Sequence, residues 1–327
     1  MIVEASAPGK VILFGEHSVV YKGPAIVLAI NKRARVFAEK RNDDRIFMDS
    51  EDLGYSGFFI GDKYYPVKGA PWRGRSLTAL NLVSRKTIEK LGVESGLNLK
   101  FRSEIPSAVG LGSSAAICVA TAAAIDELFE GKLSQEEICA LAYEGEKVIH
   151  GRPSGVDNNV STYGGVLKYE GGVGFEKITL EESPCFIIGN TKQKRSTGRM
   201  VQIVSELRER NKSIVDEIIE ILGKVSEMGL TYLLKHDYEH LGELMDICHG
   251  LLNSLGVSTP MLDKLVHTSR ESGAMGAKLT GAGGGGCMIA LVDEERLNAV
   301  EEAIKIAGGV PMRVDVSYEG VKTRRVD

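Results

Sequence analysis

Residues 104–117 read Glu-Ile-Pro-Ser-Ala-Val-Gly-Leu-Gly-Ser-Ser-Ala-Ala-Ile and lead into an alanine-rich segment. That segment, residues 113–129, is expected to be strongly helical, because alanine has the highest helix propensity. Gly110 and Gly112 permit a tight turn in which the backbone comes close to a bound group. The two serines that follow open the helix with hydroxyls and with N–H groups that have no partner inside it. The stretch therefore predicts a seat for phosphate at a helix N-terminus.

Two nucleotide-binding motifs match parts of this loop, but the surrounding sequence does not fit them. Gly110-x-Gly112-x-x-Ala115 fits the dinucleotide fingerprint, which needs a strand running directly into the turn and an acidic residue about 20 positions later. Here Pro106 and further loop residues intervene, and the predicted helix continues where that acidic residue should end a strand. A Walker-type loop fails because no Gly-Lys pair is followed by Ser or Thr. A glycine-rich helix start that serves packing alone stays the alternative.

The composition is that of an ordinary globular protein. At 327 residues the chain is expected to form two domains or one elaborate α/β unit. Its net charge of −4 gives no bias toward polyanions, so nucleic acid is not an expected partner. No run of about 18 apolar residues occurs, and the first residues do not resemble a signal peptide. We therefore expect a cytoplasmic protein without a membrane partner.

Cysteine and glycine are distributed in informative ways. The five cysteines are odd in number and widely spaced among mostly apolar neighbours, which predicts reduced core thiols. The 38 glycines cluster around Gly110 and in residues 281–286. Because such clusters mark places where the backbone bends or closely approaches another group, both are candidate sites.

The order of expected elements indicates an α/β protein with two domains. In the first half, strands are expected over 2–6, 25–30, 35–40, 46–49 and 97–102, and helices over 77–91, 113–129 and 134–149. Residues 151–165 are expected to be a polar turn region. In the second half, strands near 167, 178 and 186 precede helices over 197–210, 213–234, 238–255 and 260–272 and a strand–strand–helix–strand unit over 276–316. We place the domain boundary near residues 170–183.

Residues 7–17, Ala-Pro-Gly-Lys-Val-Ile-Leu-Phe-Gly-Glu-His, place three polar residues between short apolar segments and glycines. Taken singly, Lys10 would be a solvated lysine, Glu16 a surface carboxylate and His17 a core histidine. Their occurrence together in one glycine-containing segment favours a site instead.

Residues 144–158 combine an acidic helix end with a glycine-containing turn. Phosphoryl transfer needs a magnesium ligand, a cation that neutralises developing charge, and a carboxylate that receives or orients the proton of the acceptor hydroxyl. Glu146, Lys10 and Asp157 can supply these three roles. In isolation, Asp157 is better explained as an Asx-turn residue that only shapes the loop.

Two other motif matches do not fit their surroundings. Gly281-x-Gly283-x-x-Gly286 is a second literal dinucleotide match, but an apolar strand follows it rather than a helix. It is either a glycine-rich hairpin or backbone that passes close to another loop or a ligand. His236 and His240 match an inverted zinc-protease string, yet the neighbouring charges are typical of a solvated helix.

Four motifs in one order resemble the GHMP kinase superfamily, and most closely its mevalonate-phosphorylating members. They are the segment at 7–17, Gly-Leu-Gly-Ser-Ser-Ala-Ala at 110–116, His-Gly-Arg-Pro-Ser-Gly-Val-Asp-Asn at 150–158 and Lys-Leu-Thr-Gly-Ala-Gly-Gly-Gly-Gly at 278–286. The resemblance implies a two-domain α/β fold, with an N-terminal ribosomal protein S5-like domain and a C-terminal ferredoxin-like α+β domain. It assigns residues 1–178 to ATP binding and catalysis and residues 179–327 to a helix-rich α+β domain.

The resemblance also implies how ATP, the co-substrate, and Mg²⁺ bind. Ser114 and Glu146 correspond to the magnesium ligands. The glycine cluster at 281–286 corresponds to backbone that supports the phosphate loop. The phosphate-binding loop itself corresponds to Pro106, Ser107, Ala108, Val109, Gly110, Leu111, Gly112, Ser113, Ser114, Ala115 and Ala116.

The acceptor side of the site is implied in the same way. Asp157 corresponds to the carboxylate that takes the acceptor proton, and Lys10 to a lysine beside it that stabilises the charge of the transferring phosphate. Glu16 and His17 correspond to substrate contacts. Thr197, in the string Arg-Ser-Thr at 195–197, corresponds to a further one.

Residues around these motifs narrow the choice of acceptor alcohol. A galactokinase would continue Gly-Glu-His with Thr-Asp-Tyr, whereas this chain continues Ser-Val-Val-Tyr-Lys-Gly, and homoserine kinases lack the string at 150–158. The resemblance therefore implies phosphorylation of the 5-hydroxyl of mevalonate to 5-phosphomevalonate, in isoprenoid precursor synthesis. Arg152 departs from the pattern, because this position is usually small or neutral. An extra cation there leaves phosphomevalonate or another small alcohol as the alternative acceptor.

A non-catalytic, metabolite-binding member of the superfamily is the alternative from a different class. Such a protein needs no proton acceptor, so the combination of Lys10, Ser114, Glu146 and Asp157 argues against it. The resemblance further implies a homodimer.

Overall fold

Two long strands at the start of the chain form the centre of a large sheet. The computed structural model describes residues 1–151, 153–171, 173–194 and 196–326. β1 (Ile2–Phe14) and β2 (Pro24–Arg41) pair antiparallel along most of their lengths. Nearly all side chains of β1 and of the first half of β2 are buried. Helices α2 (Ser113–Leu128) and α4 (Val156–Tyr163) pack against these strands on one side, and α6 (Lys212–Leu234) packs on the other.

The strands form two sheets within the described part of the chain. The larger sheet has nine strands in the order β13-β1-β2-β6-β3-β4-β5, with β7 paired to β2 and β8 paired to β7. Its other strands are β3 (Ile46–Ser50), β4 (Tyr55–Ile60), β5 (Lys63–Lys68), β6 (Gly96–Ser103), β7 (Val166–Glu170), β8 (Gly174–Ile178) and β13 (Lys322–Val326). The smaller, antiparallel sheet has the order β10-β11-β9-β12 and consists of β9 (Phe186–Asn190), β10 (Gly276–Thr280), β11 (Cys287–Leu291) and β12 (Val310–Val314).

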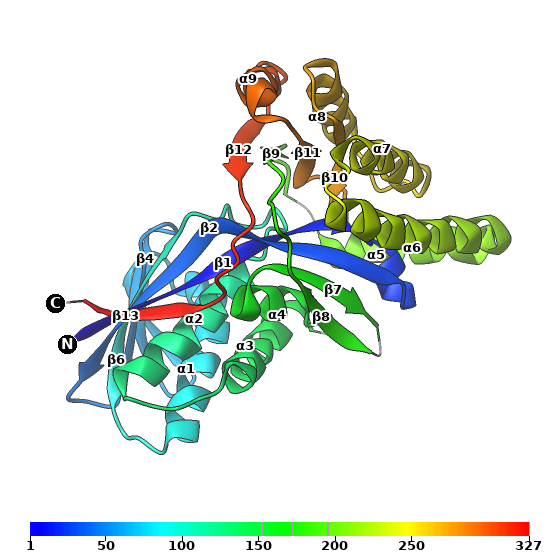
Figure 1. Ribbon diagram of the computed structural model, residues 1–327. Helices are drawn as coiled ribbons and strands as arrows, with labels where there is room; N and C mark the ends of the chain where they lie inside the picture. The colour runs from blue at the N-terminus through cyan, green and yellow to red at the C-terminus, as the bar shows by residue number, and fades with distance from the viewer. Residues whose placement is uncertain (152, 172, 195, 327) are drawn as a thin grey trace.

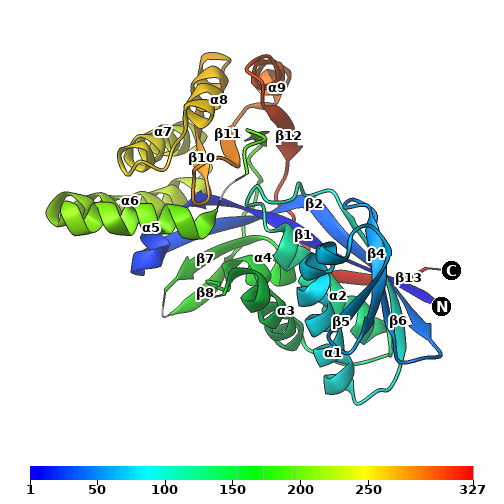
Figure 2. The same cartoon turned by 180° about the vertical axis from the view of Figure 1, so that it is seen from behind.

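Helices from the first half of the chain cover one face of the larger sheet (Figures 1 and 2). Of the helices from the second half, the last three pack on the smaller sheet, and the second packs on β1 and β2 of the larger sheet. The first group is α1 (Thr78–Leu91), α2 (Ser113–Leu128), α3 (Gln135–His150) and α4 (Val156–Tyr163). The second group is α5 (Thr197–Arg210), α6 (Lys212–Leu234), α7 (Tyr238–Ser254), α8 (Pro260–Glu271) and α9 (Leu297–Ile306). Most alanines of α2 are fully buried, which lets this helix lie close to β1 and β2.

A bulge interrupts the pairing of β1 and β2. The register shifts between Pro8 and Gly9, where β2 contributes two additional residues between Ile30 and Arg33. Because proline has no N–H to donate to the sheet, a bulge is a favourable place for it. The irregularity lies one residue before Lys10, so it sets the direction in which that side chain leaves the strand.

Most of the predicted helices and strands occur in the structure. The differences arise where packing between distant segments determines the secondary structure. Residues 25–30 and 35–40 belong to one strand, β2, and β1 continues well beyond residue 6. The prediction of a turn region over 151–165 is wrong, because α4 occupies its middle. This helix is only eight residues long and contains few strong helix formers, so its packing on β1 and α2 stabilises it. β4, β5 and β13 were not predicted from the sequence.

The chain returns to the larger sheet at its end. β13 pairs antiparallel with β1, and the two termini lie side by side (Figure 1). The buried guanidinium of Arg33 ties this return to the sheet, donating to the carbonyls of Ser6 (2.9 Å) and Gly320 (2.5 Å). β8 ends at Ile178 in the larger sheet and β9 begins at Phe186 in the smaller one. The division into domains 1–178 and 179–327 stays a prediction.

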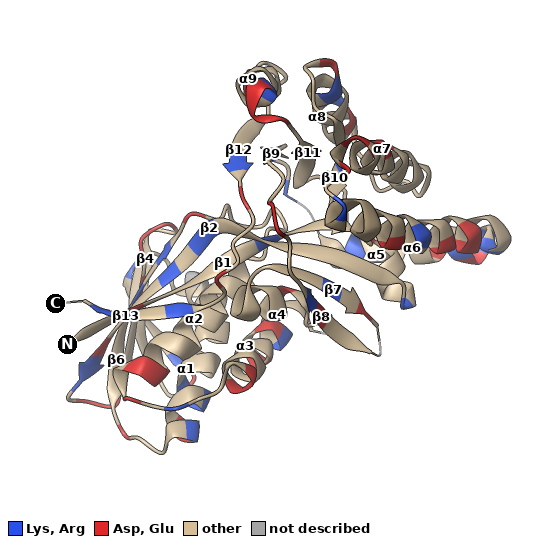
Figure 3. Cartoon of the chain, viewed as in Figure 1, with Lys and Arg blue, Asp and Glu red and all other residues tan. Residues whose placement is uncertain are grey.

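The molecular surface carries both signs of charge. Figure 3 shows acidic and basic residues interspersed along α3, α6 and α9. No helix in the described ranges is long and apolar enough to span a bilayer. Four of the five cysteines are buried, and Cys185 is half-buried.

β10 is an edge strand of the smaller sheet, and α7 supplies partners for its outward N–H groups. Asp246 accepts a hydrogen bond from Ala277 N (2.9 Å), and His249 Nδ1 accepts one from Leu279 N (3.3 Å). These contacts cover groups that an open edge would present to other chains. Burial lowers the pKa of His249 to about 4, and the nearby Arg270 acts in the same direction. The ring is therefore neutral near pH 7.

We expect His249 to make the folded protein less stable as the pH drops from about 6.5 to about 4. In this window the unfolded chain protonates the histidine and the folded chain does not, so protons favour unfolding. His249→Asn keeps an acceptor for Leu279 N but does not titrate. The stability advantage of wild type over the variant, from urea unfolding curves, should shrink by on the order of 2 kcal/mol between pH 7 and pH 4. A difference that stays constant with pH contradicts this.

Candidate active site

The strand that carries Lys10 is locked to the loop that precedes α2. Lys10 N donates a hydrogen bond to Leu111 O at 2.9 Å. A side chain at Gly9 would come within 2.8 Å of the same carbonyl oxygen, so glycine is needed for this close approach. Val109 and Leu111 are buried and anchor the loop, whereas Ser107 and Ala108 are exposed.

The loop ends in the helix start that was predicted. α2 begins at Ser113, and its N-cap residue, Gly112, has a φ of 75°. Gly110 also has a positive φ, of 87°, and both positions therefore favour glycine. Because Gly112 offers no capping side chain, the first N–H groups of α2 stay available to an anion at the positive end of the helix dipole.

The side chain of Lys10 extends from β1 past Gly112 to Asp157. Its Nζ lies 3.1 Å from Asp157 Oδ1; the lysine side chain is buried and the aspartate is about one-third exposed. Asp157 lies in the first turn of α4. Ser161 of the same helix donates to Pro8 O at 2.8 Å, which holds α4 against the strand that carries Lys10. The ion pair is thus fixed from both sides.

Glu146 of α3 is the third charged residue at this place. Its side chain is 2% exposed, and Oε1 is buried without a hydrogen-bond partner. Burial raises the pKa of Glu146 to about 7; the hydroxyl of Ser114 lowers it by hydrogen bonding, Asp157 raises it by charge repulsion, and Lys10 lowers it. These influences show that Lys10, Ser114, Glu146 and Asp157, predicted from three separate motifs, lie together.

This cluster fits one kind of metal ion. Within the described residues, no group of three or more His, Cys, Asp or Glu side chains could hold a metal by itself. Ser114 and Glu146 nevertheless present hard oxygen ligands, and the unpartnered Glu146 Oε1 gains from a cation. Mg²⁺ commonly takes one or two protein carboxylates and completes its shell with water and nucleotide phosphates. The donor set therefore fits Mg²⁺ held together with a nucleotide.

Glu16 and His17 lie just beyond β1, against the glycine cluster of the second half. Glu16 forms an ion pair with Lys278 of β10, and both side chains are fully buried. His17 Nε2 lies 3.0 Å from Ala282 O. Thr280 Oγ1 donates to Ile12 O at 2.8 Å and so connects the same two segments. The structure thus brings the first and last of the four motifs into contact.

Within the described residues, no hydrogen bond or ion pair links Thr197 to these two groups. Thr197 is the exposed first residue of α5, whose N-terminus is capped by the side chain of Ser196. Arg195 of the same string, and Arg152, lie outside the described residues.

Lys278 was missed at the sequence level. It belongs to the quoted motif at 278–286, but no role was assigned to it. The available signal was one charged residue inside an apolar five-residue strand, Gly-Ala-Lys-Leu-Thr. Such a lysine is rarely buried without a partner, so a carboxylate elsewhere in the chain should have been sought.

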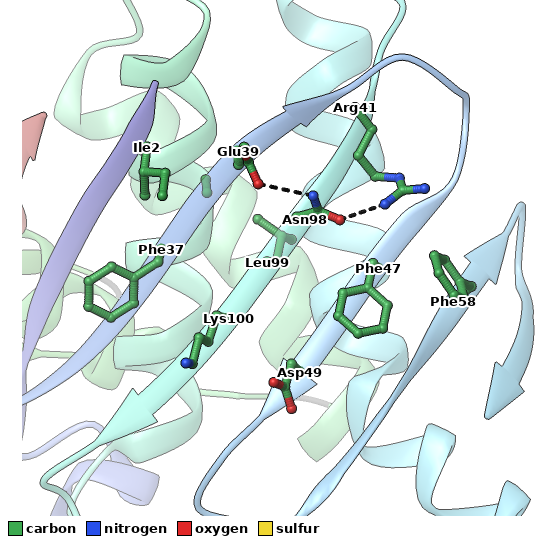
Figure 4. A pocket seen from close by; sticks show the side chains of 11 residues that line it. Ile2, Phe37, Glu39, Arg41, Phe47, Asp49, Phe58, Asn98, Leu99 and Lys100 are labelled. Carbon is green, nitrogen blue, oxygen red and sulfur yellow. Dashed lines mark hydrogen bonds between the residues drawn. The ribbon is translucent and has the colours of Figure 1, made fainter. Parts of the chain in front are cut away.

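A hollow of about 410 Å³ lies on the face of the larger sheet that α1–α4 leave open. Figure 4 shows Phe47 and Phe58 on the adjacent strands β3 and β4, and Phe37 on β2 beyond β6, together with polar residues such as Glu39 and Lys100. None of the predicted site residues lines it. The hollow is therefore separate from the Lys10–Asp157 cluster.

Comparison with known proteins identifies the class. The family described as GHMP kinases N terminal domain matches residues 78–165, and GHMP kinases C terminal matches residues 230–309. The chain belongs to the GHMP kinase family, and the α/β fold expected from its motifs is confirmed.

Within this family the chain is similar to proteins named mevalonate kinase. It is 42% identical to the mevalonate kinase of Thermococcus gammatolerans, an alignment that covers 100% of this chain and 99% of the relative. The crystal structure of the Methanococcus jannaschii mevalonate kinase matches with a TM-score of 0.83 and 31% identity, over 97% of this chain and 98% of that one. The L. major mevalonate kinase in complex with R-mevalonate matches with a TM-score of 0.83 and 27% identity, over 96% of each chain.

We predict that Gly112→Ala lowers both stability and activity. The added methyl group meets Lys10 Cγ at 2.8 Å and also forces a non-glycine residue to a φ of 75°. Gly54→Ala is the matched control, because Gly54 has a similar φ of 69° and open space around it. Backbone strain should cost each variant about 1 kcal/mol in urea unfolding, and only Gly112→Ala should also lose kcat. Equal kcat in the two variants would show that Lys10 is not displaced.

Proposed function

We propose that this protein phosphorylates the 5-hydroxyl of mevalonate with ATP. The observation that carries the proposal is the Lys10–Asp157 ion pair at the N-terminus of α2, beside the buried Glu146. The similar proteins named mevalonate kinase support the choice of acceptor. The arrangement supplies a carboxylate, a cation and a helix N-terminus within one cluster, which are the groups that phosphoryl transfer needs.

In this proposal, some residues act on the acceptor hydroxyl and others bind the phosphates of ATP. Asp157 Oδ2 accepts the proton of the attacking hydroxyl, while Oδ1 stays paired with Lys10 and so keeps the carboxylate oriented. The ammonium of Lys10 also stabilises the negative charge of the transferring phosphoryl group. The loop over 106–112 and the first N–H groups of α2 bind the other phosphates of ATP. Glu16 and His17 contact the acceptor, and Thr197 is proposed as a further contact.

We further propose that Ser114 and Glu146 hold Mg²⁺. When bound, the ion neutralises phosphate charge and orients the transferring group. The role of the protein is to deliver a serine hydroxyl from α2 and a buried carboxylate from α3 to one place. Because burial raises the pKa of Glu146 to about 7, Mg²⁺ binding competes with a proton near neutral pH.

Two alternatives remain and have distinct outcomes. Phosphomevalonate or another small alcohol stays the alternative acceptor, and Arg152, on which it rests, lies outside the described residues. A metabolite-binding protein without turnover is the alternative from another class. The homodimer and the cytoplasmic location stay predictions.

A substrate panel tests the acceptor. Mevalonate should have the highest kcat/KM among mevalonate, 5-phosphomevalonate, galactose and homoserine in an ADP-coupled assay. Asp157→Asn, which preserves shape and removes the proton acceptor, should lower kcat by about 10²- to 10⁴-fold with little change in ATP binding. If another alcohol has a higher kcat/KM than mevalonate, that alcohol replaces mevalonate as the assigned acceptor. If wild type transfers phosphate to none of the alcohols, the metabolite-binding protein without turnover becomes the supported alternative.

The metal ligands are tested by two substitutions on one helix. Glu146→Gln should raise the Mg²⁺ concentration for half-maximal activity by at least about 10- to 100-fold, the effect typical of losing even an outer partner of a metal site. Glu144→Gln is the control, since Glu144 lies two residues away and pairs instead with Lys86 and Lys147. If both variants need the same Mg²⁺ concentration as wild type, Glu146 is not a ligand.

A further inference from the structure

The start of the chain and the edge strand β10 cross at a place where their side chains alternate toward one another. Ile12 N donates to Thr280 Oγ1 (3.2 Å), and Thr280 Oγ1 donates back to Ile12 O (2.8 Å). Phe14 and Lys278 each lie two residues from this contact, and Lys278 Nζ is 5.9 Å from the centre of the Phe14 ring. Two residues further on, Glu16 pairs with the same ammonium. The crossing therefore ends in a buried ion pair between the larger and the smaller sheet.

Lys278 is fully buried, and each of its neighbours stabilises its charge. Its ammonium donates to the carboxylate of Glu16 and to Leu279 O at 2.9 Å, and the Phe14 ring adds a cation–π contact. Burying a lysine is costly unless such partners are present, and removing one partner leaves an uncompensated charge. A leucine or methionine would fill the same space without that cost, so packing alone does not explain a lysine here.

The two oxygens of the Glu16 carboxylate have different surroundings. One carboxylate oxygen accepts from Lys278, while Oε2 is buried without a hydrogen-bond partner. An unsatisfied buried oxygen is uncommon in a folded protein and calls for an explanation, such as a ligand that donates to it. A hydroxyl donor of a small ligand satisfies such an oxygen, and the next residue, His17, lies against Ala282 of the glycine cluster.

We propose that Lys278 is a positioning residue for the acceptor: from the smaller sheet it holds the Glu16 carboxylate so that the free oxygen accepts a hydrogen bond from a hydroxyl of the substrate. The inference rests on the proposed function, in which Glu16 contacts the acceptor alcohol. The inference adds that recognition of the acceptor depends on the contact between the larger sheet, which carries Glu16 just beyond β1, and the smaller sheet, which carries Lys278.

The Glu16–Lys278 pair has further titratable neighbours on the same segment and on α7, and His17 is the next residue after Glu16. Burial raises the pKa of Glu16, whereas Lys278, through charge and hydrogen bonding, and the backbone N–H groups of Glu16 and Gly281 lower it. On α7, behind β10, burial raises the pKa of Cys248 to about 12 and lowers that of His249 to about 4, so both are neutral near pH 7. Without the ammonium, the pKa of Glu16 rises further and its carboxyl group takes up a proton at higher pH.

Lys278→Met tests the proposal in the full-length protein. We expect kcat/KM for mevalonate to fall by about 10- to 100-fold, the worth of one hydrogen bond to a charged group, mainly through KM. KM for ATP should change by less than about twofold. The acidic limb of the pH profile of kcat/KM should move to higher pH, because the remaining carboxyl group now titrates later. An unmoved limb with equal losses for both substrates overturns the proposal in favour of a structural role.

Two further variants separate positioning from stability. Thr280→Val removes the hydrogen bonds to Ile12 but keeps the ion pair, so its acidic limb should coincide with that of wild type. Glu16→Gln combined with Lys278→Met replaces the charged pair by a neutral one of similar size, which keeps the test valid if Lys278→Met does not fold. In the Glu16→Gln background, adding Lys278→Met should raise KM by less than about twofold. A second loss as large as in wild type would show that Lys278 does not act through Glu16.

The failure of the proposed function is distinguishable from the failure of this inference. If wild type transfers no phosphate to mevalonate, the acceptor assignment falls, and the same comparison is made with whichever alcohol of the panel is accepted. Independently of turnover, the carboxyl ¹³C resonance of Glu16, assigned with Glu16→Gln, reports its titration. It should titrate at higher pH in Lys278→Met than in wild type. Identical titration in the two proteins would refute the positioning role.

Discussion

The close contact between β1 and the loop before α2 is the constraint on which the site depends. Lys10 N bonds to the carbonyl of Leu111, and neither Gly9 nor Gly112 has room for a side chain between strand and loop. The side chain of Lys10 therefore runs past Gly112, at the start of α2. Three helices then add one reactive group each, because α2 and α4 pack on β1 and α3 packs on α2. Phosphate seat, cation and carboxylates are therefore parts of one packing arrangement.

Burial raises the pKa of both buried carboxylates at the site, Glu146 and Glu16, but the groups that compensate for burial differ. Glu146 shares its surroundings with Asp157 and receives only partial compensation from Lys10, so its pKa rises to about 7 and it gains from an added cation. Glu16 instead has a dedicated ammonium, that of Lys278, and retains one free oxygen. The first arrangement suits a metal-bound nucleotide, whereas the second suits a neutral donor such as an alcohol. The two ends of the site thus differ in the charge that they accept.

Local features were predictable because they depend on neighbouring residues. The start of α2 at Ser113 and the opening of α3 by Ser134 follow from helix propensity, glycine conformations and capping. α4 was missed, because its eight residues are held by distant packing rather than by their own preference for a helix. β13 was missed for a related reason: its exposed Lys-Thr-Arg-Arg-Val sequence becomes a strand only because the edge of β1 is available.

The order and composition of four motifs were enough to indicate the class of enzyme, because each motif is recognisable from its own residue types and spacing. The residues proposed to surround the transferring phosphate come from the same motifs. The chain order does not reveal which segments meet. Glu16 and Lys278 are 262 positions apart, and their ion pair exists only because two sheets cross at β1 and β10. Local backbone preferences act over a few residues, whereas burial and charge pairing are properties of the packed whole. Tertiary structure therefore decided that the proposed acceptor end of the site is shared between both halves of the protein.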